Sequence, residues 1–295
     1  MKKTLILGGN GYTGSVIKKY LDNIFDVDVY GSRSDDYNKL DKEYINSFEY
    51  VILLAGHSSV QRCDGPLLPV WNNNVRNFHN LLQKMTPEQK LIYASSASVY
   101  GNSDYDGEYT ESYTNYEYVN NYDLTKISLD MLAKNYISEG RNIVGFRFGT
   151  VNGESDVLRI DLMINAMVHT AINQGVINVT NKHVNRPILG TNDLSRAMKQ
   201  TIIANDFVPG IYNLTSFNSN VDAISKTISN VLGTQIIDNG NTITYNFKMS
   251  NSKFSDVYKF KFEDTVDTIT ENVIECLNNK NTVVVKRNEY FDYKG

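Results

Sequence analysis

The sequence has 295 residues, of which 41% are hydrophobic and 21% charged, and its formal net charge is −4. This charge provides no basic surface for a nucleic acid, and no apolar run is long enough to span a membrane, so we expect small-molecule partners. Cys63 and Cys276 lack CxxC or Cys/His spacing, which predicts neither a metal site nor a disulfide framework. The three apolar residues at 5–7 are too few for a signal peptide, which predicts a cytoplasmic protein.

The first half of the chain alternates short apolar runs with segments of helical spacing. The apolar runs are TLIL (4–7), VDVY (27–30), YVILLA (50–55), KLIYAS (90–95) and NIVGFRF (142–148). Helical faces follow the third and fourth runs, from Val75 to Met85 and from Leu124 to Tyr136. This alternation is typical of βαβ units, so we predict an α/β fold with a Rossmann-like, doubly wound parallel sheet.

The pattern changes after Gly149. We predict helices near 158–174, 191–205, 219–232 and 264–279, and strands at 176–179 and 211–215. Residues 1–150 and about 188–215 are expected to form the sheet domain. Residues about 151–187 and 216–295 are expected to form a smaller, C-terminal lobe.

Three regularly spaced glycines follow the first apolar run in GGNGYTG. Gly8, Gly11 and Gly14 stand between a predicted strand and a predicted helix, where glycine lets the backbone approach a pyrophosphate. The GxxGxxG spacing is one residue longer than GxGxxG, and such residues also form plain turns. In its strand–helix context the motif predicts a dinucleotide site.

The end of the second strand bears on the choice of cofactor. NAD-binding proteins commonly place an acidic residue there to bind the ribose hydroxyls. This chain has Ser32 and Arg33 instead, and an arginine suits the extra phosphate of NADP. In a shifted register, Asp35 or Asp36 serves as the acid and suits NAD. We therefore expect NADP or NAD, with NADP favoured by Arg33.

A tyrosine and a lysine stand four residues apart in YDLTK (122–126), after the serine-rich end of the fourth strand. On a helix, Tyr122 and Lys126 share one face, where an ammonium group favours the phenolate form of a tyrosine. A hydroxyl from Ser96 is suited to bond the same substrate oxygen. Chance YxxxK matches are easy among 20 tyrosines, but this one follows both a glycine loop and a serine-bearing strand. The sequence predicts Ser96, Tyr122 and Lys126 as a catalytic group.

Together, these motifs resemble those of the extended short-chain dehydrogenases/reductases, in the nucleotide-sugar epimerase/dehydratase family. The resemblance covers nearly the whole chain and includes GGNGYTG, VILLAG, WNNNVRNFHNLL, SSASVYG, YDLTK, RFGTVNG, LRIDLMINA and RPILGTNDLSR. It implies that the sheet domain binds NAD(P) and that the smaller lobe binds a nucleotide sugar. It also implies a homodimer formed through the helices near 72–86 and 120–138.

The resemblance also implies individual binding residues. The cofactor residues are Gly8, Gly11, Tyr12, Gly14, Ser32, Arg33, Asp41, Leu54, Ala55, Asn74 and Lys126. The substrate residues are Ser98, Tyr100, Asn152, Asn165 and Arg186.

The sequence departs from the family pattern in two places. The family's dehydratases have Thr-Asp-Glu where this chain has Ser96-Ala97-Ser98, so dehydration is disfavoured. Family members that combine 3,5-epimerisation with reduction have a cysteine at the position of Ala97. Segment 242–250 lacks an arginine that the family often uses to bind phosphate.

Redox chemistry at one sugar carbon remains, and the resemblance favours a nucleotide-sugar 4-epimerase. The alternatives are an NADPH-dependent 4-keto-sugar reductase and a catalytically inactive NAD(P)-sensing or scaffold protein. Two smaller features leave alternatives open. His57 either borders the cofactor or is an ordinary loop histidine, and the tyrosine-rich stretch 105–122 is either a lid over the ligand or a loop packed by its own rings.

Overall fold

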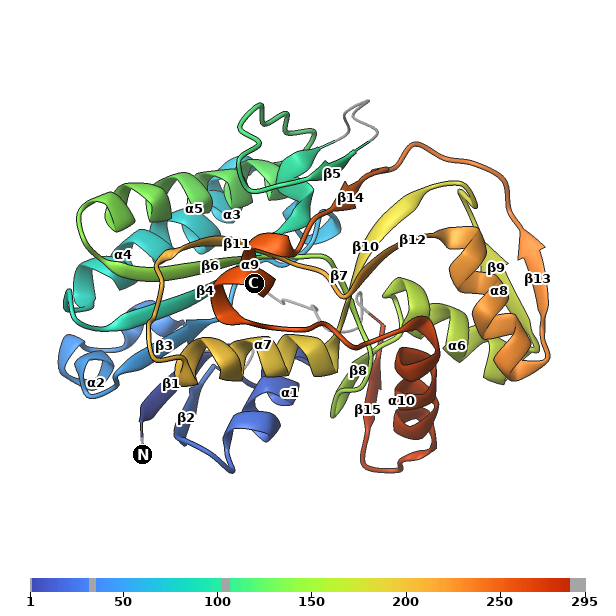
Figure 1. The fold of residues 1–295 in the computed structure, drawn as a ribbon, viewed down its shortest axis with the longest axis horizontal. Coiled ribbons are helices and arrows are strands. Elements are labelled where there is room, and N and C mark those ends of the chain that lie inside the picture. The colour runs from blue at the N-terminus through green and yellow to red at the C-terminus, as the bar shows by residue number, and fades with distance from the viewer. Residues whose placement is uncertain (1, 32–35, 102–106, 287–295) are drawn as a thin grey trace.

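The computed structural model describes residues 2–31, 36–101 and 107–286. Its largest element is a six-stranded parallel sheet with the strand order β11-β6-β4-β3-β1-β2 (Figure 1). The strands are β1 (Lys3–Leu7), β2 (Asp26–Tyr30), β3 (Tyr50–Leu53), β4 (Lys90–Ser96), β6 (Asn142–Phe148) and β11 (Gly210–Leu214). The predicted Rossmann-like parallel sheet is confirmed.

Helices cover both faces of this sheet. Leu5 and Leu7 belong to the buried cluster that contains α4 (Asn77–Lys84) and α5 (Asn121–Ser138). Ile6, which points to the opposite face, belongs to the cluster that contains α1 (Tyr12–Leu21) and α7 (Thr191–Ile203). Because both faces are buried, the strands read as nearly continuous apolar runs, which explains why the sequence reveals them.

The order of the strands creates a switch point at β1, which lies between β2 and β3. In open parallel sheets, ligands bind at the carboxyl ends of the strands beside such a point. Gly8 directly follows β1, and Leu54 and Ala55 directly follow β3. The fold therefore brings the glycine loop and the end of β3 to one edge.

A second group of elements lies to the right of the main sheet in Figure 1. It contains the three-stranded sheet β12-β10-β7, the parallel pairs β9–β13 and β8–β15, and three helices. The bounds are β7 (Thr150–Asn152), β8 (Val157–Arg159), α6 (Met163–Gln174), β9 (Val176–Val179), β10 (Asn185–Gly190), β12 (Phe217–Asn220), α8 (Val221–Leu232), β13 (Gln235–Asp238), α10 (Val266–Asn278) and β15 (Val283–Val285). The boundary between two domains remains a prediction, since β11 joins the main sheet whereas β10 pairs with β7 and β12.

Shorter elements complete the described residues. They are η1 (Tyr37–Lys39), α2 (Lys42–Asn46), η2 (Gln61–Cys63), α3 (Leu67–Trp71), the π-helical η3 (Asn72–Arg76), η4 (Ala97–Tyr100), β5 (Glu108–Tyr109), β14 (Lys248–Met249) and α9 (Ser252–Tyr258). The helix predicted near 158–174 begins at Met163, because residues 157–159 form β8, which pairs with β15. No helix in the described part is long and apolar enough to cross a membrane.

Candidate active site

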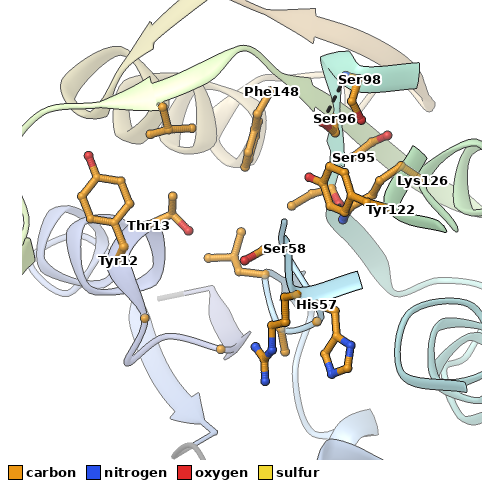
Figure 2. Close-up of a pocket in the computed structure, with 18 of the residues that line it drawn as sticks. Tyr12, Thr13, His57, Ser58, Ser95, Ser96, Ser98, Tyr122, Lys126 and Phe148 are labelled. Atoms are coloured by element: carbon orange, nitrogen blue, oxygen red, sulfur yellow. Dashed lines mark hydrogen bonds between the residues drawn. The ribbon is translucent and has the colours of Figure 1, made fainter. Parts of the chain in front are cut away.

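A cavity of about 860 Å³ lies at the switch point. Its walls come from the glycine loop, the ends of β3 and β4, the start of α5, the end of β6 and parts of the smaller group of elements. Figure 2 shows Tyr12 and Thr13 on one side of this space and Tyr122 and Lys126 on the other. A cavity of this size suits an organic ligand, and within the described residues no cluster of His, Cys, Asp or Glu is placed to hold a metal ion.

The glycine loop leaves no room for side chains. A Cβ on Gly14 would lie 2.2 Å from the Gly8 carbonyl oxygen, and a Cβ on Gly8 would lie 2.7 Å from the Ala55 nitrogen. Gly8 also has a φ of +90°, which favours glycine. Gly11 precedes α1 without a side-chain cap, so the first N–H groups of this helix remain available to an anion. This loop has the features of a pyrophosphate site.

The predicted catalytic group comes together on one wall, where Ser96, Tyr122 and Lys126 all line the cavity. The Lys126 Nζ atom lies 5.7 Å from the centre of the Tyr122 ring and donates to the Ala94 carbonyl oxygen at 2.8 Å. Burial lowers the pKa of Lys126 to about 8. The Ser96 hydroxyl oxygen accepts a bond from the Ser98 N–H at 3.1 Å, which orients it at the end of β4 (Figure 2).

One turn after Lys126, a buried ion pair joins α5 to β6. The Arg147 guanidinium lies 2.7 Å from the Asp130 carboxylate, and both side chains are almost fully buried. Arg147 also donates to the hydroxyls of Tyr100 and Tyr116, at 2.9 and 2.8 Å. Burial opposes the charge of Arg147, but the neighbouring Asp130 carboxylate raises its pKa overall. The network holds the helix that carries Tyr122 against the sheet.

Several other predicted binding residues also line the cavity. The predicted residues that line the cavity are Gly8, Gly11, Tyr12, Leu54, Ala55, Ser96, Ser98, Tyr122, Lys126 and Arg186. Ser32 and Arg33 lie outside the described residues, so the structure does not place the proposed NADP contact. Asp36, the acid of the alternative register, does line the cavity.

The remaining predicted residues make internal contacts and do not line the cavity. Gly14 packs against Gly8, and Asp41 caps α2 through the Tyr44 N–H at 2.6 Å. The Tyr100 hydroxyl donates to Asn213 Oδ1 at 2.7 Å. Tyr100 and Gly14 therefore pack inside the protein, whereas Asp41 is exposed and caps α2.

Three predicted asparagines also point into the protein. Asn74 Oδ1 accepts the His57 N–H at 2.8 Å, and its Nδ2 donates to Thr125 on α5 at 3.1 Å. Asn152 Oδ1 accepts the N–H of the second residue of α6 at 2.9 Å. Asn165 is fully buried and its Oδ1 accepts the Gly153 N–H at 3.0 Å. Their amides hold loops in place.

His57 lines the cavity beside Ser58 (Figure 2). Burial lowers the pKa of His57 to about 4, so the ring is neutral at pH 7. His57 Nδ1 and Ser95 Oγ are buried and make no hydrogen bond to any described residue. Buried polar atoms without partners are rare in native proteins, so these two atoms are suited to contact a ligand.

The sequence did not single out several wall residues. Phe148, Pro187, Tyr245 and Phe247 contribute apolar or aromatic surface to the cavity. Phe148 directly follows Arg147 in RFGTVNG, and the two aromatic residues at 245 and 247 lie in the segment noted for its missing arginine. Their position in these two segments was the only feature of the sequence that could have identified Phe148, Tyr245 and Phe247 as cavity residues.

The tyrosine-rich stretch packs on the protein itself in its described part, residues 107–122. Tyr109 stacks on Tyr100 with ring centres 4.8 Å apart, and Tyr113 packs edge-on against Tyr109 at 4.7 Å. Tyr116 binds Arg147. Of this described part, Tyr122 alone lines the cavity, which favours the self-packed loop over the lid. Residues 105 and 106 lie outside the described residues.

A parallel sheet, a glycine loop at its switch point and a Tyr–Lys pair on the helix after β4 define an extended short-chain dehydrogenase/reductase. The chain belongs to the NAD dependent epimerase/dehydratase family, whose sequence model matches residues 4–215. This confirms the family inferred from the motifs.

Solved structures with the same fold include enzymes of different activities. RMD from Pseudomonas aeruginosa, complexed with NADPH, aligns at a TM-score of 0.77 and 17% identity over 93% of this chain and 98% of that one. UDP-glucuronic acid 4-epimerase from Bacillus cereus, with UDP-glucuronic acid and NAD, aligns at 0.80 and 18% over 92% and 98%. dTDP-glucose 4,6-dehydratase from Bacillus anthracis, with NAD, aligns at 0.78 and 18% over 95% and 98%. At these identities the similarity establishes the fold.

Proposed function

We propose that the protein is an NAD(P)-dependent enzyme that acts on a nucleotide-activated sugar by redox chemistry at C4, as a 4-epimerase. The observation that carries this proposal is the convergence of Ser96, Tyr122 and Lys126 on a cavity that also contains the glycine loop. The solved structures of similar fold contain NADPH, or NAD with UDP-glucuronic acid, which supports a site for both ligands.

The residues of the cavity fit a nicotinamide dinucleotide. The glycine loop and the uncapped start of α1 suit its pyrophosphate, and Lys126, which lines the cavity, is the residue we propose to bond the nicotinamide ribose. His57 Nδ1 and Ser95 Oγ make no hydrogen bond to a described residue, so both atoms are suited to bond the cofactor. When bound, the cofactor takes up or supplies a hydride.

Arg33 supports NADP, whereas Asp36 at the cavity wall supports NAD. We retain NADP, since a charge-assisted contact to the 2′-phosphate is worth about 1.5–3 kcal/mol. Arg33→Ala is expected to weaken NADPH binding more than NADH binding in fluorescence titrations. Equal losses for the two cofactors would contradict the preference.

The side chains of this chain supply the proton chemistry. Tyr122 takes the proton from the sugar hydroxyl or returns it to the keto oxygen, and Ser96 bonds the same oxygen. The Lys126 ammonium, near the Tyr122 ring, favours the phenolate. Arg186, a cavity residue whose guanidinium is charged, is suited to the diphosphate of the substrate.

Dehydration would need an acid and a base beside the sugar. Ala97 and Ser98 are both buried at the end of β4 and carry no carboxyl group. Because a dehydratase has the same fold, the fold does not exclude dehydration, and the reaction product must be identified. Mass spectrometry is expected to find that the product keeps its C6 oxygen, and a 4-keto-6-deoxy product would contradict the proposal.

Turnover of a nucleotide-sugar panel by Tyr122→Phe tests the mechanism. The variant keeps the ring and loses the hydroxyl, so turnover should fall at least about 10²-fold while the cofactor still binds. Near wild-type turnover would refute the assignment. In the wild type, interconversion of 4-epimers without net cofactor consumption indicates an epimerase. Stoichiometric NADPH oxidation indicates a 4-keto-sugar reductase, and cofactor binding without turnover indicates a sensing or scaffold protein.

A further inference from the structure

An irregular segment, residues 239–247, crosses between two cavities, and we call it the strap. It connects β13 to β14 (Figure 1). A second cavity of about 590 Å³ lies next to the first, on the side of α6 and β9. Tyr245 of the strap and Arg186 of β10 line both cavities. A ligand that occupies both spaces must pass these two side chains.

The strap is tied to the β9–β10 connection on one side. The Thr242 N–H donates to Asn181 Oδ1 at 2.6 Å, and Asn181 Nδ2 donates to the Thr242 hydroxyl at 3.0 Å. The Asn185 N–H donates to Asn246 Oδ1 at 2.9 Å. These bonds fix both sides of Tyr245 to the smaller group of elements.

Tyr245 itself is tied to the start of the catalytic helix. Its hydroxyl donates to Asp123 Oδ2 at 2.8 Å and accepts a bond from Asn120 Nδ2 at 2.5 Å. Asn120 also caps α5, since its Oδ1 accepts the Asp123 N–H at 3.0 Å. The residues that begin the helix of Tyr122 therefore also hold the strap.

The Asp123 side chain, in the first turn of α5, is completely buried, which is rare for a carboxylate. Burial raises the pKa of Asp123, while the bonds from Tyr245, Val119 and Asn120 favour its ionised form. A buried carboxylate is costly unless its hydrogen bonds are made, and Tyr245 supplies one of them. A bond to a carboxylate in such surroundings is stronger than a bond between neutral groups.

Tyr245 in turn contacts Arg186. The Arg186 guanidinium lies 6.0 Å from the centre of the Tyr245 ring, and its Nη2 donates to the Thr244 hydroxyl at 2.5 Å. No carboxylate of the described residues forms an ion pair with Arg186. Its positive charge is therefore available to an anionic group at the junction of the cavities.

We infer that Asp123 is a positioning residue: through Tyr245 it sets the distance between Arg186, which holds the diphosphate, and Tyr122, which acts on the sugar. The inference rests on the proposed function. The carboxylate anchors the phenol, and the phenol packs beside the guanidinium. The sugar of a bound nucleotide sugar is thereby presented to Tyr122 in a fixed register, which matters because small errors of position are costly to catalysis.

The test compares Tyr245→Phe, Asp123→Asn and the double variant. Tyr245→Phe keeps the ring beside Arg186 and removes only the hydroxyl that bonds Asp123. Tyr20→Phe is the matched control, because this tyrosine of α1 lines neither cavity. Each variant is assayed for turnover of the wild-type substrate, for binding of UDP, dTDP, GDP or ADP as the matching sugar-free probe, and for cofactor binding. Amide exchange of residues 239–247 reports the anchor directly.

We expect kcat/KM for the nucleotide sugar to fall about tenfold or more in Tyr245→Phe, the loss of one charge-assisted bond. Binding of the sugar-free nucleotide and of the cofactor should change less than about threefold, since neither requires the register. The double variant should lose little more than the more impaired single variant, because all three lack the bond between the Tyr245 hydroxyl and the charged Asp123 carboxylate. Amide hydrogen exchange of the strap should be faster than in the wild type in these three variants and unchanged in Tyr20→Phe.

Unchanged kcat/KM in Tyr245→Phe would overturn the inference. Equal losses for the nucleotide sugar, the sugar-free nucleotide and the cofactor would also overturn it, because they would indicate a purely structural contact. Absence of wild-type turnover on every nucleotide sugar would refute the proposed function instead. In that case, equal amide hydrogen exchange of residues 239–247 in the wild type and in Tyr245→Phe would also refute the role of the Tyr245–Asp123 bond in holding the strap.

Discussion

Raising the pH from 7 to 9 should remove the proton from Lys126 in the cofactor-free protein, because burial lowers the pKa of this side chain to about 8. With that pKa, roughly nine-tenths of the molecules carry the ammonium at pH 7 and roughly one-tenth at pH 9. The charged form is the low-pH form and is the one suited to bond the ribose. Apparent affinity scales with the competent fraction, so cofactor binding should weaken about tenfold across this interval.

Titrations of NADPH and NADH fluorescence between about pH 6 and 10 measure this dependence. Lys126→Met keeps the length of the side chain and removes its charge, so it should bind weakly at every pH, with no inflection near 8. His57 does not interfere, because its pKa of about 4 lies below the range. A flat profile in the wild type, or an inflection near 8 that persists in Lys126→Met, would refute the role of Lys126.

Three further predictions concern stability, cofactor binding and assembly. Asp130→Ala leaves the buried charge of Arg147 without its partner, so urea denaturation should show that the free energy of unfolding falls by about 3–5 kcal/mol. A decrease of less than about 1 kcal/mol would contradict a buried ion pair. Gly14→Ala places a methyl group against Gly8, so calorimetry should show no cofactor binding while circular dichroism shows a folded chain; normal binding would count against the packed loop. We propose that the chain dimerises through α4 and α5, where Met131 is 61% exposed; M131K should shift sedimentation towards monomer, and a wild-type monomer would refute the proposal.

The sequence predicts the parts of this fold that depend on local patterns. Buried parallel strands are continuous apolar runs, and the glycine spacing requires a tight turn at the end of β1. Tyr122 and Lys126 are predictable for the same reason, since four residues on a helix place them on one face. These features need no knowledge of distant contacts.

The asparagines show where such reasoning stops. An amide has both donors and an acceptor, and it serves equally well as a ligand contact or as a brace for a loop. Asn165 was predicted to bind substrate, but its amide bonds Gly153 and lies inside the protein. Tyr245 lines the cavity because its hydroxyl bonds Asp123, more than a hundred residues earlier in the chain. Strands as short as β8 and β15 are likewise too short to show an alternating hydrophobic pattern in the sequence. They form because they pair with each other.

The pairing of β8 with β15 affects when the site can exist during synthesis. Val285 pairs with Arg159, and both line the cavity. A nascent chain that has already folded its parallel sheet still lacks this wall until residue 285 has left the ribosome. A ligand that needs the whole cavity therefore binds only after translation has passed that point. Cleavage of the chain before β15 should leave a folded sheet with a site open on one side.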